Sequence, residues 1–136
     1  MDISQYLSVF MDECQEHLGT LNQSLLALEN NPENSELLDA IFRAAHTLKG
    51  ASATMGFNKM ANLTHTMEDV LSRLRSKELE VTSEIINALF DSFDMLEELA
   101  RGIGEGKEED IEVTGVVQNL RQFLTPSGKA PVDNRN

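Results

Sequence analysis

Four stretches of this chain repeat apolar residues at alternating steps of three and four, which is the spacing of residues on one face of an α-helix. In the first stretch, from about residue 3 to residue 29, the repeat consists of Leu7, Phe10, Cys14, Leu18, Leu21, Leu25 and Leu28. The apolar face of a strand would repeat at every second residue instead. The chain must therefore bury long helical stripes against one another.

The other three stretches follow the same rule, and each is bounded by residues that begin or end helices. In chain order the predicted boundaries are Asn30-Asn31-Pro32, an N-cap at Asn34 or Ser35, the break Gly56-Phe57-Asn58, an end near Ser76, an N-cap at Thr82 or Ser83, and an end at Gly102, Gly104 and Gly106. The predicted buried stripes are Leu38, Ile41, Phe42, Ala45, Leu48 and Met55, then Met60, Leu63, Met67, Val70, Leu71 and Leu74, then Ile86, Leu89, Phe90, Phe93, Leu96, Leu99 and Ile103.

Four amphipathic helices joined by short loops bury their stripes most economically as an antiparallel up-down four-helix bundle, so the predicted fold class is all-α. A short fifth helix at the C-terminal end would pack across the others, and it is built on Val116, Val117, Leu120, Phe123 and Leu124. We expect one domain over residues 1–125, because no stripe continues beyond Thr125. Residues 126–136 have the polar, proline-containing composition of a flexible linker, which is typical of a domain cut from a longer protein.

Charge and composition narrow the classes of function. Eleven Lys plus Arg residues stand against 23 Asp plus Glu residues, for a formal net charge of -12. This charge repels phosphate backbones, so it argues against nucleic-acid binding and favours protein partners with basic rims. No apolar run reaches the roughly 18 to 20 residues that span a bilayer, and no signal-peptide pattern is present. Cys14 has no second cysteine to pair with, which favours the reducing cytoplasm, and it is expected to be buried and inert.

One histidine, His46, lies among small residues in the second predicted helix, within the run from Ala45 to Met55. On a helix, Lys49, Gly50 and Ala53 share its face. Glycine inside a helix costs about 0.5 to 1 kcal/mol relative to alanine, so Gly50 requires a packing reason or a functional one. Close approach of a partner protein to the histidine would be such a reason.

The third predicted helix carries His65, Glu68 and Ser72 on its outer face. A tight turn makes this helix an antiparallel neighbour of the second, so we expect its polar face to meet that of His46 and Lys49. An imidazole is a nucleophile only through its unprotonated nitrogen, so a carboxylate is needed to hold the proton on the opposite nitrogen. Glu68 is the candidate for this role, and Lys49 is the candidate for balancing the charge of a transferred phosphoryl group.

At these positions the chain resembles histidine phosphotransfer (HPt) domains, whose signature H-x-x-K-G lies on the second helix of a four-helix bundle. The signature here is His46-Thr47-Leu48-Lys49-Gly50. The longer string over residues 45–57, followed by His65-Thr66-Met67-Glu68, is similar to the N-terminal domains of chemotaxis histidine kinases of the CheA family. The resemblance covers about residues 3–125.

The resemblance implies a phosphoryl relay in chemotaxis signalling. His46 would accept a phosphoryl group from ATP bound on the kinase catalytic domain of the same protein or of its dimer mate, and would pass it to an aspartate of the response regulators CheY and CheB. The domain would hold no cofactor or metal, because ATP and Mg²⁺ would bind the separate kinase domain and Mg²⁺ the response regulator. It would not be an enzyme by itself, and the isolated domain is expected to be monomeric.

The resemblance also implies roles for individual residues around the phosphorylated histidine. Glu68 would hydrogen-bond its second ring nitrogen. Lys49 and His65 would support the phosphorylated site. Gly50 would keep the docking face open, and Ala53 shares that face.

Three rival functions remain open on the residues alone. A metal-binding bundle would need Glu-x-x-His on facing helices, but none of His17, His46 and His65 has a glutamate three positions before it. A plain adaptor bundle would carry an exposed histidine only incidentally. A kinase would need an ATP site, and the chain has no candidate for one.

Overall fold

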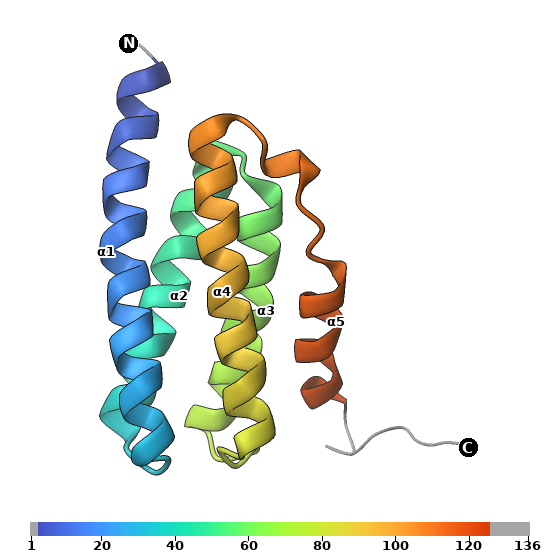
Figure 1. Ribbon diagram of the computed structural model, residues 1–136. Helices are drawn as coiled ribbons and strands as arrows, with labels where there is room; N and C mark the ends of the chain where they lie inside the picture. The colour runs from blue at the N-terminus through green and yellow to red at the C-terminus, as the bar shows by residue number, and fades with distance from the viewer. Residues whose placement is uncertain (1–2, 126–136) are drawn as a thin grey trace, which may run out of the picture.

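Four long helices and one short helix make up most of residues 3–125, which are the residues that this computed structural model describes. The helices are α1 (Ile3–Asn30), α2 (Ser35–Met55), α3 (Asn58–Arg75), α4 (Ser83–Glu105) and α5 (Thr114–Arg121), with single 3₁₀ turns at Glu108–Asp110 and Gln122–Leu124. Successive long helices run in opposite directions (Figure 1). The predicted all-α, antiparallel bundle with a fifth helix is confirmed, whereas the predicted linker over residues 126–136 lies outside the described residues.

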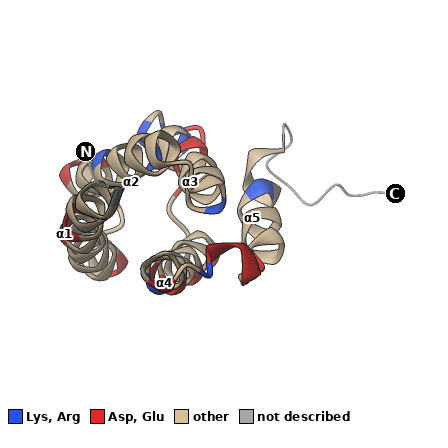
Figure 2. Ribbon diagram, turned by 90° about the horizontal axis from the view of Figure 1, so that it is seen from above, with Lys and Arg blue, Asp and Glu red and all other residues tan. Residues whose placement is uncertain are grey.

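Seen along the bundle axis, α1, α2, α3 and α4 surround the core in chain order (Figure 2). Each packs against its neighbours in this order, and α4 also contacts α1, which closes the bundle. α5 lies outside it against α3 and α4. The largest fully buried side chains come from all four long helices, and they are Leu21, Leu25, Leu28, Ile41, Leu48, Met60, Leu63, Met67, Leu71, Leu89, Leu96 and Leu99.

The helix ends follow from local chemistry. Of the two candidate N-caps of α2, the structure uses Asn34, whose side chain accepts hydrogen bonds from the backbone N–H groups of Glu36 and Leu37 at 2.9 and 3.1 Å. Thr82 caps α4 in the same way. Gly56 ends α2 with a φ of 82°, a left-handed conformation that glycine adopts without steric cost. This turn places α3 directly beside α2 and so builds the hairpin on which the candidate site lies.

The predicted end of α4 was wrong in its detail. The helix continues through Gly102 and Gly104, and only Gly106 adopts the left-handed conformation, with a φ of 72°. Gly102 is buried, and a Cβ atom built on it would lie 2.5 Å from Cδ1 of Ile111. This glycine therefore serves close packing of the segment before α5, and does not end the helix.

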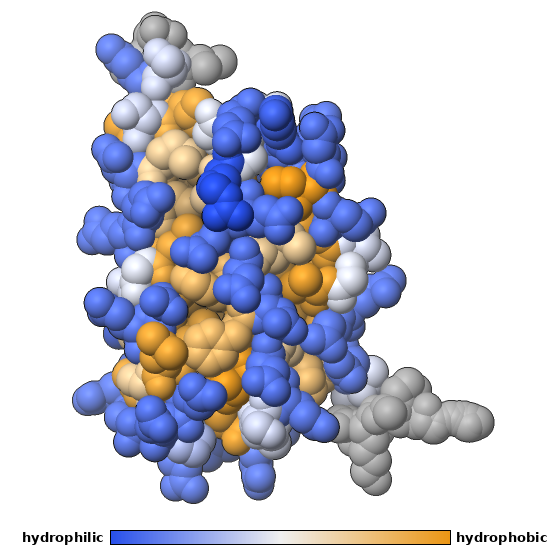
Figure 3. Space-filling model, viewed as in Figure 1, coloured by the Kyte–Doolittle hydropathy of each residue, from blue (hydrophilic) through white to orange (hydrophobic). Residues whose placement is uncertain are grey.

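Four members of the predicted stripes, Leu7, Phe42, Met55 and Phe90, are only half-buried. They lie at the edges of their stripes, where a helix face turns from the core toward solvent. Polar side chains cover much of the face built by α1 and α4, with apolar surface showing between them (Figure 3). None of the helices within residues 3–125 is long and apolar enough to cross a membrane.

Candidate functional site

A carboxylate on α3 joins two side chains of α2. Glu68 accepts a hydrogen bond from Nδ1 of His46 on its Oε2 atom, and one from the Lys49 ammonium on its Oε1 atom at 2.5 Å. His46 and Lys49 are three residues apart, so both project from the same face of α2 toward α3. The structure thus brings together three of the four residues expected to form the site.

Glu68 is buried, whereas the sequence pattern placed it on the outer face of the third helix with His65. That expectation was wrong because the side chain turns into the seam between α2 and α3. Burial by itself raises the pKa of the Glu68 carboxyl, but the hydrogen bonds from Lys49 and His46, together with the nearby ammonium of Lys49, outweigh it and lower the pKa below its usual value. Glu68 is therefore an ionised carboxylate at neutral pH.

The ionisation of Glu68 determines the tautomer of His46. A carboxylate can only accept hydrogen bonds, so Nδ1 of His46 carries the hydrogen that bridges it to Glu68. In the neutral imidazole the lone pair is then on Nε2, on the opposite edge of the ring. Nε2 accepts no hydrogen bond within residues 3–125, and the side chain of His46 is 60% exposed. The arrangement presents an unprotonated ring nitrogen to solvent.

The structure reveals a second set of contacts that sequence reasoning missed. The ring of Phe42 lies parallel to that of His46, and the Arg75 guanidinium lies over the Phe42 ring. Arg75 also pairs with Asp39 at 2.9 Å. The available signal was the spacing of four between Phe42 and His46, which puts the two rings on one helix face, but Phe42 was interpreted as part of the core.

His65 lies apart from the hydrogen-bonded group. Its Nε2 is 3.7 Å from Oδ2 of Asp69, one turn further along α3, and its side chain is 61% exposed. Within residues 3–125 it makes no hydrogen bond to His46, Lys49 or Glu68. The structure therefore does not bring it into the network that fixes the imidazole.

The predicted docking face is open. Gly50 and Ala53 are exposed, and a Cβ atom at Gly50 would meet nothing within 4 Å. Beside them, a groove of about 610 Å³ runs between α1 and α2, and its walls include Tyr6 and Val9, two of the exposed large apolar side chains. Contiguous exposed apolar surface of this kind is typical of protein-interaction sites and of ligand-binding grooves.

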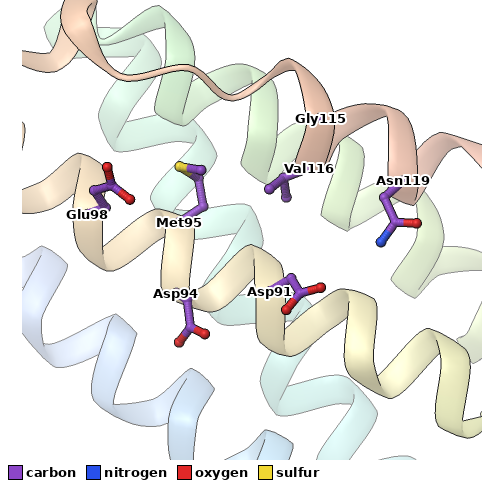
Figure 4. A pocket seen from close by; sticks show the side chains of 7 residues that line it. All are labelled: Asp91, Asp94, Met95, Glu98, Gly115, Val116 and Asn119. Carbon is purple, nitrogen blue, oxygen red and sulfur yellow. The ribbon is translucent and has the colours of Figure 1, made fainter.

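A separate hollow of about 490 Å³ lies between α4 and α5 (Figure 4). Its lining includes Asp91, Asp94 and Glu98, and no basic side chain. Such a surface repels phosphate groups. Within residues 3–125 no three His, Cys, Asp or Glu side chains are grouped so as to hold a metal ion.

Comparison with known proteins agrees with this geometry. The family model described as Hpt domain matches residues 5–123. The chain belongs to the Hpt domain family. It is 50% identical over 117 residues to the chemotaxis protein CheA of Bacillus subtilis (strain 168), an alignment that spans 84% of this chain and 17% of that protein. The chain is thus similar to a small part of a much longer chemotaxis protein.

Solved structures of Hpt domains share the fold. The CheA phosphotransferase domain from Thermotoga maritima is 45% identical with a TM-score of 0.72, covering 76% of this chain and 98% of that one. A histidine phosphotransfer domain of CheA, solved in solution, is 38% identical with a TM-score of 0.82, covering 97% and 100%. The phosphorylated P1 domain of CheA3 from R. sphaeroides, in complex with CheY6, is 24% identical with a TM-score of 0.79, covering 88% of this chain and 95% of that one. At this identity the comparison shows that the two chains share a fold. This Hpt domain is therefore of the kind found in CheA.

Proposed function

We propose that Nε2 of His46 is the phosphoacceptor of this Hpt domain. The observation that supports this most directly is the hydrogen bond from Nδ1 of His46 to the buried Glu68 carboxylate, which leaves the lone pair on the solvent-facing nitrogen. In CheA-type signalling the phosphoryl donor would be ATP on a kinase catalytic domain of the same parent protein or of its dimer mate. The acceptor would be an aspartate of the response regulators CheY and CheB.

In the first transfer, Nε2 attacks the γ-phosphorus of ATP, an N–P bond forms, and the P–O bond to the leaving ADP breaks. The hydrogen on Nδ1 stays in place, so the phosphorylated ring carries a positive charge that the Glu68 carboxylate stabilises at hydrogen-bonding distance. In the second transfer, a carboxylate oxygen of the regulator attacks the phosphorus and the N–P bond breaks. His46 returns to its neutral form with the same tautomer.

Lys49 has two roles in this proposal. Its ammonium holds the second oxygen of Glu68, which keeps the carboxylate turned toward His46. Its positive charge also offsets part of the negative charge that the phosphoryl group brings to the same helix face. The support of the phosphorylated site by His65 stays a prediction that replacement of His65 alone can test.

The catalytic apparatus of the first transfer would belong to the partner, because phosphoryl transfer needs a nucleotide and Mg²⁺ held in line with the acceptor. The domain would therefore act as a relay and not as an enzyme by itself. The chain spans about a sixth of the length of the B. subtilis relative, so the parent protein, its kinase activity and its cytoplasmic location are part of the proposal.

The deciding experiment incubates the 136-residue chain with ATP, Mg²⁺ and a CheA kinase core that lacks its own Hpt domain, and locates acid-labile phosphate by mass spectrometry. We expect phosphate on His46, and none when the core is omitted or when His46→Gln replaces the wild type. An active core that leaves the wild-type chain unlabelled would overturn the relay and favour the plain adaptor bundle.

A further inference from the structure

An aromatic side chain lies against the imidazole of the candidate phosphoacceptor. Phe42 precedes His46 by four residues on α2, and the two rings are parallel to within 6°, with their centroids 6.1 Å apart. This separation is in the range of offset-stacked aromatic pairs. The Glu68 hydrogen bond holds one edge of the imidazole, and the stack holds the plane of the ring.

Arg75 of α3 contacts the phenyl ring in turn, and is itself paired with a residue of α2. The guanidinium carbon of Arg75, at the end of α3, lies 4.3 Å from the centroid of the Phe42 ring, a cation–π contact. The Nε of Arg75 donates to Oδ1 of Asp39 at 2.9 Å, and Asp39 is three residues before Phe42 on α2. Asp39, Arg75, Phe42 and His46 thus form a continuous chain of contacts that leads to the imidazole.

The surroundings of His46 are asymmetric along α2. Toward the start of the helix the imidazole is stacked on Phe42, and toward the end of the helix Gly50 leaves open space. Phe42 is only half-buried, so filling the core does not by itself account for a phenylalanine at this position. Its ring lies beside the imidazole, parallel to it.

We propose that Phe42, held by Arg75, is a positioning residue that fixes the plane of the His46 imidazole for phosphoryl transfer. The inference rests on the proposed function of His46. The lone pair of Nε2 lies in the plane of the ring, so the orientation of the plane sets the direction from which this nitrogen meets the phosphorus atom. In-line displacement depends strongly on that alignment.

A small-molecule phosphoryl donor tests the orientation of the His46 ring without any contribution from the docking of a partner protein. With phosphoramidate, the P–N bond of the donor breaks, its protonated amine leaves as ammonia, and Nε2 of His46 gains the phosphoryl group.

On the 136-residue chain we expect Phe42→Leu to slow this reaction about three- to tenfold, the factor that corresponds to the loss of one aromatic pair. Phe42→Tyr keeps the ring and should react at nearly the wild-type rate. Phe90→Leu is the matched control, since Phe90 is also half-buried but lies on α4.

Nuclear magnetic resonance supplies a readout that a loss of stability would not move. The ring current of Phe42 shifts the ring protons of His46, so we expect Phe42→Leu to change these chemical shifts and Phe42→Tyr to retain them. Arg75→Met alters a side chain that is 40% exposed and leaves the core intact, so it should fold normally. We expect it to shift the same protons in the same direction, because the phenyl ring is no longer held.

The outcomes separate the two proposals. A wild-type rate in Phe42→Leu, or equal slowing in the Leu and Tyr variants, would overturn the positioning role while leaving His46 as the phosphoacceptor. A wild-type chain that takes phosphate on His46 from neither phosphoramidate nor the kinase core would overturn the proposed function itself.

Discussion

Nδ1 of His46 and Oε2 of Glu68 are hydrogen-bonded across the seam between α2 and α3, although 22 positions separate the two residues in the chain. The bond exists because the turn at Gly56 brings the two helices together as an antiparallel pair. The tertiary fold thereby determines which nitrogen of the imidazole is free. The chemistry of the site depends on helix packing and not on the H-x-x-K-G signature alone.

Removal of this carboxylate should impair phosphorylation more than folding. In Glu68→Ala, the hydrogen on the His46 ring is no longer held on Nδ1, and the charge that stabilises the phosphorylated ring is lost. We expect phosphorylation by a CheA kinase core to slow about ten- to hundredfold, the loss seen when the hydrogen-bond partner that orients a metal-ligating histidine is removed. The initial rate is measured by phosphoryl incorporation, and circular dichroism checks the helix content. Glu97→Ala, an exposed change on α4, is the control, and equal rates in the two variants would remove the assigned role of Glu68.

The same carboxylate makes stability depend on pH. Its folded-state pKa is below the value of about 4.3 expected in the unfolded chain, so ionised Glu68 stabilises the native state at neutral pH. This contribution is present above the unfolded pKa and is lost as the pH falls through the folded pKa. We expect Glu68→Gln to be about 1 to 2 kcal/mol less stable than the wild type at pH 7, with the difference shrinking below about pH 4.3. Urea unfolding from pH 7 to pH 3 measures the difference in the free energy of unfolding between the two proteins. A difference that grows toward acid pH would contradict the direction assigned to the pKa of Glu68.

His46 should matter for transfer but little for folding. Its side chain is 60% exposed, so His46→Gln buries no new group and opens no cavity. We expect the free energy of unfolding to change by less than about 1 kcal/mol, while labelling by the kinase core is abolished. Thermal unfolding, monitored by circular dichroism, measures the stability. A loss of stability several times larger than about 1 kcal/mol would mean that the imidazole supports the core.

Much of the fold was predictable because local signals agreed with one another. The stripes of α1 to α4 repeat over long segments, and the candidate caps at Asn34 and Thr82 were among the residues that the structure uses. The predicted end of α4 at Gly102 was wrong, because a glycine within a helix and a glycine after a helix cannot be told apart from the sequence. The difference lies in a tertiary contact, the approach of Ile111, that no local pattern contains.

The site was less fully predictable than the fold. Helical spacing places His46, Lys49 and Gly50 on one face, but it does not specify the rotamer that turns Glu68 inward and leaves His65 outside. A long side chain at the edge of a buried stripe can point either way, and its partners on the neighbouring helix decide. The spacing of four puts Phe42 and His46 on one face of α2, but the contact of Arg75 from α3 with the Phe42 ring became visible only with the two helices in place.

Cys14 should be unreactive in the native protein. It is buried, and desolvation raises its pKa to about 11, so only about one thiol in a thousand is ionised at pH 8. We expect alkylation by iodoacetamide to be at least about a hundredfold slower in the native chain than in the urea-unfolded chain. Since Cys14 is the only cysteine, mass spectrometry reports its modification without ambiguity. Equal rates in the two states would show that α1 opens readily.

Alanine substitutions at Gly50 and Gly19 distinguish an effect on the stability of the domain from an effect on the docking of a partner protein. Both are exposed helical glycines with nothing within 4 Å of a built Cβ atom, and neither has a positive φ. Alanine at either position should therefore raise the free energy of unfolding by about 0.5 to 1 kcal/mol. Gly50 lies one turn from His46 on the open face of α2, whereas Gly19 lies on α1 outside the apolar groove.

If a partner approaches α2 closely at Gly50, then Gly50→Ala should raise the KM for phosphorylation by the kinase core severalfold, while Gly19→Ala leaves it unchanged. Both variants should react with phosphoramidate at the wild-type rate, because that donor needs no protein contact. Equal KM values in the two variants would mean that the open face is not the docking face. The glycine would then have neither a packing nor a docking role, since the structure already shows room for a larger residue.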